Sequence, residues 1–188
     1  MLRCRQLAGE HLGESMAGLR MKPTEFKAMV SEIEDMYSRF RRISTDGFVS
    51  AEEPIEADVH DGIVLRGRID AVFDDGLGAR IVDWKTGSFL DDTDAQMDFY
   101  ALAWRLVHGA PPTMTEATSL ATGEQVQRHP DEISTDQTLA DVEAMVAAIR
   151  SAVETMTELE RIAGPHCQWC PLLDECSEGN AAMEILDA

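Results

Sequence analysis

The sequence has 188 residues, 44% hydrophobic residues, four cysteines and a formal net charge of −19. No apolar run approaches the ~20 residues that span a bilayer, and the first residues lack the apolar core of a secretory signal. We therefore expect a compact cytoplasmic domain that is neither inserted into a membrane nor exported.

The negative charge is concentrated in the body of the chain. The first fifty residues carry eight Lys and Arg against seven Asp and Glu, whereas the remaining 138 residues carry eight against 28. Phosphates demand a positive surface, so the acidic composition argues on its face against nucleic acid as a partner, and an acidic surface by itself usually serves solubility. Lysine is scarce as well, because Lys85 is the only lysine after Lys27.

The first half of the chain predicts helices followed by a meander of strands. Apolar residues at helical spacing favour a basic-ended amphipathic helix, and the Asp61-Gly62 and Asp75-Gly76 pairs are hairpin signals. The expected elements are helices over about 5–19 and 23–42, and strands near 48–59, 63–73 and 79–84.

The second half predicts a helix, two weaker strands and a long helix. The expected ranges are 93–107, 114–121, 125–128 and a helix that Ser134 or Thr135 caps and that runs to about residue 156. This order predicts a mixed α/β fold in one domain, residues 1–188. Its expected parts are N-terminal helices (1–45), a central sheet (46–130), and the long helix with a cysteine segment (131–188).

Acidic and basic residues interrupt two of the predicted strands. Asp70 lies among apolar residues, and Asp83 and Lys85 lie two apart, so their side chains project from the same side of a strand. If the turn at Asp75-Gly76 pairs the two strands, Asp70 comes beside Asp83. Two carboxylates that hold Mg²⁺ or Mn²⁺, with a lysine beside them, suit phosphodiester hydrolysis; the alternative is a surface Asp–Lys pair.

The next predicted helix carries two further polar groups. Gln96 and Tyr100 are spaced i, i+4 and therefore share one face near its start. Both can donate hydrogen bonds to phosphate oxygens, although an ordinary polar–aromatic pair has the same spacing.

Together these motifs resemble the PD-(D/E)XK nuclease superfamily, and specifically its RecB-like branch. The resemblance rests on Gly67-x-x-Asp70, Asp83-Trp84-Lys85-Thr86-Gly87 and Gln96-x-x-x-Tyr100. It implies a restriction-endonuclease-like core in which Asp70, Asp83 and the Trp84 carbonyl bind the metal. It also implies that Lys85 is catalytic and that Gln96 and Tyr100 contact DNA or shape the site.

The resemblance also implies a metal-binding histidine before the sheet. His11 is the candidate, and Glu10 or Glu14 could serve instead. We also expect the near-neutral N-terminal region, where Arg39, Arg41 and Arg42 cluster, to contact DNA outside the catalytic site.

The cysteines form a C-x2-C-x5-C cluster near the C-terminus and one isolated N-terminal residue: Cys167, Cys170, Cys176 and Cys4. Clustered thiolates in a cytoplasmic protein indicate a metal, and Zn²⁺ or an iron–sulfur cluster would fit four of them; four free thiols are the alternative. The pattern resembles AddB-type and CRISPR-adaptation nucleases, which implies a [4Fe-4S] cluster that joins the two ends of the domain.

We therefore expect a metal-dependent DNA nuclease, in particular an exonuclease acting on single strands or ends in repair, recombination or foreign-DNA processing. No Walker A motif is present, so any helicase activity must come from a partner or a larger chain. The competing hypothesis is a catalytically inactive, cluster-stabilised module that binds DNA or a helicase.

Overall fold

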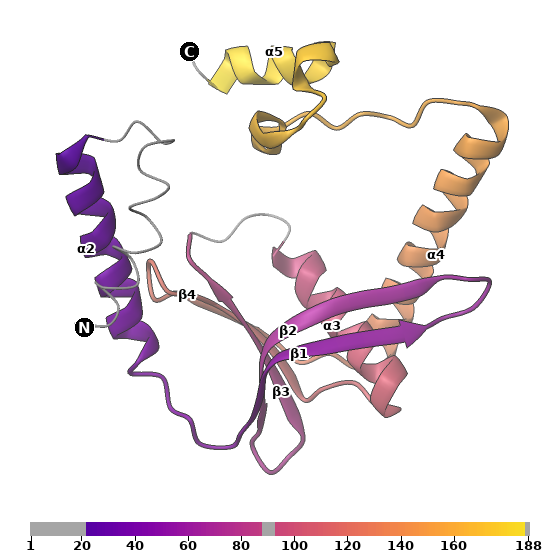
Figure 1. Ribbon diagram of the computed structural model, residues 1–188. Helices are drawn as coiled ribbons and strands as arrows, with labels where there is room; N and C mark the ends of the chain where they lie inside the picture. Colours follow the sequence, from indigo (N-terminus) through magenta and orange to yellow (C-terminus); the bar gives the residue numbers. More distant parts are fainter. Residues whose placement is uncertain (1–21, 88–92, 187–188) are drawn as a thin grey trace. The chain divides into compact units, whose positions relative to one another are not determined.

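The computed structural model describes residues 22–87 and 93–186. Its centre is a five-stranded sheet in the order β1-β2-β3-β4-β5 (Figure 1). Strands β3 and β4 are parallel and all other neighbours are antiparallel. The strands are β1 (Phe48–Asp58), β2 (Val64–Asp74), β3 (Ala79–Lys85), β4 (Met114–Ser119) and β5 (Gln125–Arg128). The predicted mixed sheet with an antiparallel meander is confirmed.

Local turn chemistry accounts for the meander. Asp61 and Gly62 both have positive φ, 50° and 75°, the combination that a tight turn between twisted strands requires. The second Asp-Gly pair lies in a longer loop, because Asp74 pairs with Ala79 and leaves four residues between the strands. The β2–β3 turn is thus where predicted but wider than a two-residue hairpin.

Helix α3 (Thr93–His108) makes the crossover that the parallel pair β3–β4 needs. Its inward side chains Met97, Tyr100 and Ala103 belong to the main core. The sheet contributes Ile55, Ile69, Val72, Ile81 and Ala117 to that core. Packing against the sheet therefore fixes which side of α3 faces β2 and β3.

Helix α2 (Pro23–Phe40) begins at the predicted proline and ends two residues earlier than predicted. Every residue of α2 is described, and none of them is buried. Its C-terminal end contacts the sheet region, because the Phe40 ring lies edge-on to Trp84 with 5.5 Å between centroids. The predicted helix at 5–19 lies outside the described residues.

Helix α4 (Glu132–Thr155) starts earlier than predicted. The side chain of Asp131 accepts a hydrogen bond from the Ser134 amide at 2.7 Å, and the Ser134 hydroxyl accepts one from the Asp131 amide at 3.0 Å. Asp131 is therefore the capping residue, and the prediction of Ser134 or Thr135 in that role is wrong. The reason is that this reciprocal pair places Ser134 inside the first turn.

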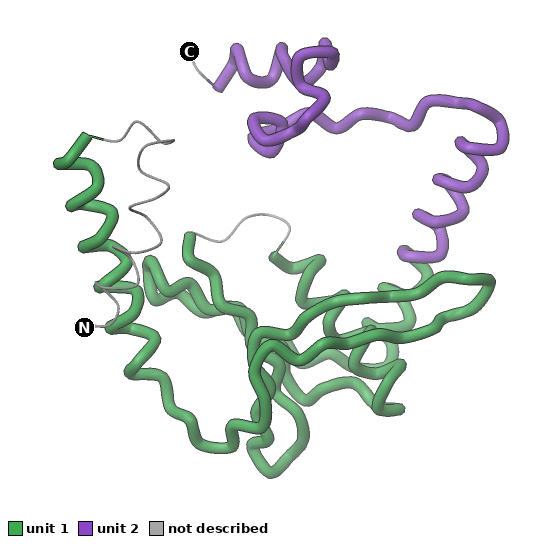
Figure 2. Tube along the Cα trace, viewed as in Figure 1, with its two compact units in different colours: residues 1–141 green, residues 142–188 purple. Residues whose placement is uncertain are grey.

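The chain divides into two compact units, residues 1–141 and 142–188 (Figure 2). The second unit contains the end of α4, two short 3₁₀ helices and α5: η1 (Pro165–Trp169), η2 (Leu173–Glu175) and α5 (Ser177–Leu186). The assignment of all 188 residues to one nuclease domain stays a prediction. None of the described helices is both long and apolar enough to cross a membrane.

Candidate active site

The register of the β2–β3 hairpin brings the two aspartates of the motifs together. Ala71 pairs with Val82, so Asp70 and Asp83 occupy the next opposed positions of the antiparallel pair. The amide of Trp84 donates a 2.8 Å hydrogen bond to Oδ2 of Asp70. This bond fixes the Asp70 carboxylate against the backbone of β3.

Asp83 and Lys85 form an ion pair along β3. Lys85 Nζ lies 2.9 Å from Asp83 Oδ2, and Asp83 is only 4% exposed. The same Oδ2 atom is buried and accepts no hydrogen bond, so its contact with the ammonium is one of charge without hydrogen-bond geometry. The Lys85 ammonium is therefore the polar contact of a buried carboxylate oxygen at the centre of the site.

Gln96 connects the strand to helix α3. Its Oε1 accepts a hydrogen bond from Lys85 Nζ, and its Nε2 donates to Asp83 Oδ1 at 3.1 Å. Nε2 also lies 3.1 Å from the Tyr100 hydroxyl, which it donates to, one helical turn along α3. The Tyr100 hydroxyl in turn donates to the carbonyl of Arg68 on β2 at 2.8 Å. The Gln96 side-chain amide thus fixes the positions of the Asp83 carboxylate and the Lys85 ammonium, the two charged groups of the D-x-K motif (Asp83-Trp84-Lys85).

The pKa values reflect two carboxylates that share a partly dry site. Burial raises the pKa of Asp70, and the negative charges of Asp83 and Glu52 raise it further, against the lowering effects of the Trp84 amide and Lys85. Burial also raises the pKa of Tyr100, and the hydrogen bond from Gln96 opposes that shift. A cation bound between the aspartates would relieve the repulsion that Asp70 experiences.

The donor set fits a hard divalent cation. Two carboxylates and the Trp84 carbonyl are oxygen ligands, and among them is Asp83 Oδ2, which contacts the Lys85 ammonium. Across residues 22–87 and 93–186, no three His, Cys, Asp or Glu side chains converge to hold a metal. Mg²⁺ characteristically binds through one or two carboxylates and takes its other ligands from water and substrate phosphate, so a two-aspartate site suits it.

Glu52 is a neighbour of the site that the sequence did not single out. It lies on β1 with a positive φ of 53° and raises the pKa of Asp70. Its carboxylate lies 3.5 Å from the Arg68 guanidinium. Nothing in the run Glu52-Glu53 distinguishes it from an ordinary solvent-facing acid, but the β1–β2 register pairs Ala51 with Ala71 and Glu53 with Ile69 and so places Glu52 opposite Asp70.

The three predicted DNA-binding arginines lie at the end of α2 and just after it, and all are exposed. Arg39 donates from Nη1 to the Leu120 carbonyl at 2.8 Å, which ties the helix end to the segment after β4. Arg41 lines a pocket that Asp70 also lines. Arg41 therefore shares a pocket with a catalytic candidate. His11 lies outside the described residues.

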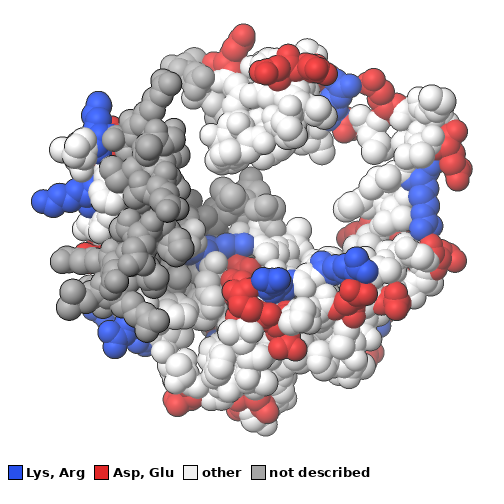
Figure 3. All heavy atoms as spheres, in the orientation of Figure 1, with Lys and Arg blue, Asp and Glu red and all other residues white. Residues whose placement is uncertain are grey.

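Charges of both signs are mixed on the visible face of the sheet. Arg66 pairs with Glu56 at 2.9 Å across β1 and β2. Figure 3 shows blue and red atoms next to one another over these strands rather than a continuous basic patch. A broad electrostatic platform for DNA is therefore lacking on that face, among the residues that the structure describes.

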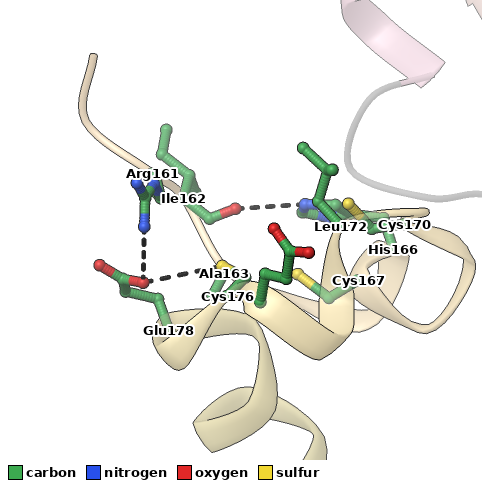
Figure 4. Close-up of a pocket in the computed structure, with 10 residues that line it drawn as sticks. Arg161, Ile162, Ala163, His166, Cys167, Cys170, Leu172, Cys176 and Glu178 are labelled. Atoms are coloured by element: carbon green, nitrogen blue, oxygen red, sulfur yellow. Dashed lines mark hydrogen bonds and ion pairs between the residues drawn. The ribbon is translucent and has the colours of Figure 1, made fainter. Parts of the chain in front are cut away.

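Three of the four cysteines line one pocket of ≈ 440 Å³ in the second unit (Figure 4). Cys167 is buried, Cys176 half-buried and Cys170 exposed, and none of the three is in a disulfide. They do not converge as a metal-binding group within the described part of the chain, and Cys4 lies outside it. The three alone therefore do not make a complete site for zinc or for an iron–sulfur cluster.

Comparisons with known proteins found a matching family and similar solved structures. A family model described as the PD-(D/E)XK nuclease superfamily matches residues 2–177. Among solved structures, a protein described as "Putative exonuclease" from Eubacterium rectale is similar with a TM-score of 0.53 and 16% sequence identity, over 92% of this chain and 74% of that one. The protein SSO0001 matches with a TM-score of 0.41 and 12% identity, over 93% and 80% of the two chains. No curated protein matches the sequence.

Proposed function

Because this chain belongs to the PD-(D/E)XK nuclease superfamily, we propose that it is a deoxyribonuclease that hydrolyses phosphodiester bonds at Asp70, Asp83 and Lys85. Nucleases of this superfamily generally use divalent metals such as Mg²⁺. The observation that carries the proposal is the Asp83–Lys85 pair on one strand, opposite Asp70 and fixed by Gln96.

Asp70, Asp83 and the Trp84 carbonyl would hold Mg²⁺ or Mn²⁺. The bound cation supplies activation of water and neutralisation of phosphate charge. Asp70 is positioned for this role by the Trp84 amide, which orients one carboxylate oxygen and leaves the other for a ligand. Asp83 contributes its buried Oδ2. His11, or Glu10 or Glu14, remains the proposed upstream ligand.

Lys85 acts on the phosphate or on the attacking water. Its ammonium lies between Asp83 and Gln96, which hold it in place without removing its charge. A fixed ammonium beside the scissile bond stabilises the negative charge that develops on the phosphate oxygens. Tyr100 is buried and its hydroxyl is engaged on both sides, which supports a positioning role rather than direct contact with DNA.

We further propose that the substrate is single-stranded DNA or a DNA end, cut exonucleolytically in repair, recombination or foreign-DNA processing. The support is the RecB-like motif order and the exposed Arg39, Arg41 and Arg42 near the site. Since these arginines are few, binding needs a divalent metal or a basic partner, for which a helicase is our candidate.

We also propose that Cys4, Cys167, Cys170 and Cys176 bind a [4Fe-4S] cluster, with Zn²⁺ as the alternative. The support is the cysteine spacing together with the common pocket of the three C-terminal thiols. Anaerobically purified protein should be brown and contain iron and acid-labile sulfide. Colourless protein with stoichiometric zinc would contradict the iron–sulfur assignment.

The nuclease proposal is tested with end-labelled single-stranded DNA, duplex DNA and RNA in Mg²⁺, Mn²⁺ or chelator. We expect metal-dependent cleavage of DNA. Asp83→Asn should lower the rate by at least about 100-fold, because substitutions even behind a metal ligand cost 10- to 100-fold. Asp75→Asn, in the exposed β2–β3 turn, is the matched control and should cleave as the wild type does.

Wild-type protein that is inert with both metals on every substrate would contradict the enzyme assignment. DNA binding by such inert protein would favour the alternative of a non-catalytic module. Cleavage by Asp83→Asn at the wild-type rate would place the activity elsewhere.

A further inference from the structure

A pocket of ≈ 420 Å³ opens beside Asp70, and most of its lining takes no part in the chemistry described above. This volume lies within the range of ~300–1,000 Å³ that is typical of ligand sites. Its apolar wall includes four aromatic rings, Phe40, Phe48, Phe73 and Trp84. Phe40 and Phe48 are 43% and 49% exposed, so large apolar rings face solvent next to the proposed catalytic centre.

The pocket is built into the fold rather than formed by a loose loop. Phe48 pairs with Phe73 across β1 and β2, and their rings meet edge to face at 5.7 Å. The segment between α2 and β1 is fastened to the sheet, because the Asp74 amide donates to the Gly47 carbonyl at 2.7 Å. The contact of Phe40 with Trp84 closes the other side. The aromatic rings are therefore held in place before any ligand binds.

The polar groups of the pocket favour a neutral ring over a phosphate. The carboxylates of Glu52 and Asp70 line it, and Glu52, which is not among the proposed metal ligands, would repel an anion inside the pocket. They can accept hydrogen bonds from amino groups, and the hydroxyls of Ser44 and Thr45 can donate or accept them. A flat heteroaromatic ligand with amino and carbonyl edges satisfies both the rings and these polar groups.

The surroundings of the pocket suit the backbone of a nucleic acid. Arg41 lines the pocket and also a second hollow that it shares with Tyr37, Ser38 and Arg42. Aromatic rings for bases beside basic residues for phosphates are the combination by which proteins bind single strands. At its inner side the pocket reaches Asp70, where the scissile phosphate would bind.

We infer that this pocket receives one unpaired base of the DNA strand that is cut, next to the scissile phosphate. The inference rests on the proposed nuclease function and specifies its substrate. A base inside a duplex is stacked and paired and cannot enter, so the pocket selects single strands and frayed ends.

The test is a scan of single-stranded oligonucleotides in which one base at a time is replaced by an abasic residue. Cleavage by the wild type should fall at one fixed distance from the cut. The expected decrease is roughly 5- to 150-fold, because stacking of a base on an aromatic ring contributes about 1–3 kcal/mol. Phe40→Leu and Phe48→Leu should cleave the intact strand more slowly and lose the dependence on the abasic position. Leu77→Ala, an exposed apolar residue in the β2–β3 loop, should keep it.

A uniform abasic profile in an active wild-type enzyme would overturn the inference while leaving the nuclease proposal intact. Photocrosslinking with a strand that carries 5-iodouracil decides the question without cleavage. Adducts on Phe40, Phe48 or Trp84 are expected. Adducts elsewhere, or a pocket shielded by the chain's own residues 1–21 in footprinting, would contradict the inference.

Discussion

The Tyr100 hydroxyl offers a direct test of how the site is held together. It donates to the Arg68 carbonyl at 2.8 Å and accepts from Gln96, and Tyr100 is 7% exposed. In Tyr100→Phe the ring keeps its packing, and Gln96 keeps its hydrogen bonds to Asp83 and Lys85. The Arg68 carbonyl, however, loses the hydrogen bond that the Tyr100 hydroxyl donates. Loss of one partner from a buried pair costs about 1–2 kcal/mol, which is the expected decrease in the free energy of unfolding.

The assay is urea unfolding followed by tryptophan fluorescence, in chelator so that metal binding does not contribute. With a urea dependence of about 2 kcal/mol/M, the midpoint should fall by about 0.5–1 M. Tyr37→Phe is the matched control, because Tyr37 is the only other tyrosine and lies exposed on α2; its substitution should change the free energy by less than about 0.5 kcal/mol. Equal midpoints for the two variants would refute the hydrogen-bond chain from α3 to β2.

Two further substitutions test the electrostatics and the backbone of the site region. Asp70 has a raised pKa in the folded state, so its contribution to stability is complete below the unfolded pKa of about 3.9 and is lost as pH rises through the folded pKa. Without metal, Asp70→Asn should therefore be more stable than the wild type at neutral pH, and Mg²⁺ should no longer stabilise it. Urea unfolding at acidic and at neutral pH measures both effects. A variant that is less stable than the metal-free wild type at neutral pH would contradict this prediction. At Gly47, with φ +72°, an added Cβ would lie 2.1 Å from the Asp74 carbonyl oxygen, whereas at Gly62, with φ +75°, it would meet nothing within 4 Å. In Gly62→Ala only the left-handed conformation is unfavourable, and the free energy of unfolding should fall by ~1–2 kcal/mol. In Gly47→Ala it should fall further because of the clash with Asp74. Equal decreases in the two variants would contradict the close packing of the α2–β1 segment.

The parts of the site that depend on local pattern could be predicted from the sequence. The opposition of Asp70 and Asp83 follows from a turn between two strands, and the common side of Asp83 and Lys85 follows from the two-residue period of a strand. The meeting of Gln96 with these residues could be predicted only through family resemblance, because it depends on how the α3 crossover packs on the sheet.

The parts that depend on exact strand register and on the path of loops could not be predicted. Glu52 lies opposite Asp70 because the turn after β1 pairs Asp58 with Val64, and the residues Glu52 and Glu53 themselves do not reveal this register. The aromatic pocket joins residues of α2, β1, β2 and β3 through the path of the segment after residue 40. The cap of α4 could not be predicted because Asp131, Ser134 and Thr135 are all good capping residues, and only the hydrogen bonds distinguish them.

The most direct measurement of the central claim is metal-dependent cleavage of single-stranded DNA by Lys85→Met and Lys27→Met, prepared in parallel with the wild type. Lys27 lies exposed on α2, whereas Lys85 contacts Asp83 and Gln96. We predict that Lys27→Met cleaves at the wild-type rate and that Lys85→Met loses about 100- to 1,000-fold, the cost of removing one group that stabilises developing charge. Equal cleavage by both variants would contradict the assignment of the active site to the D-x-K motif.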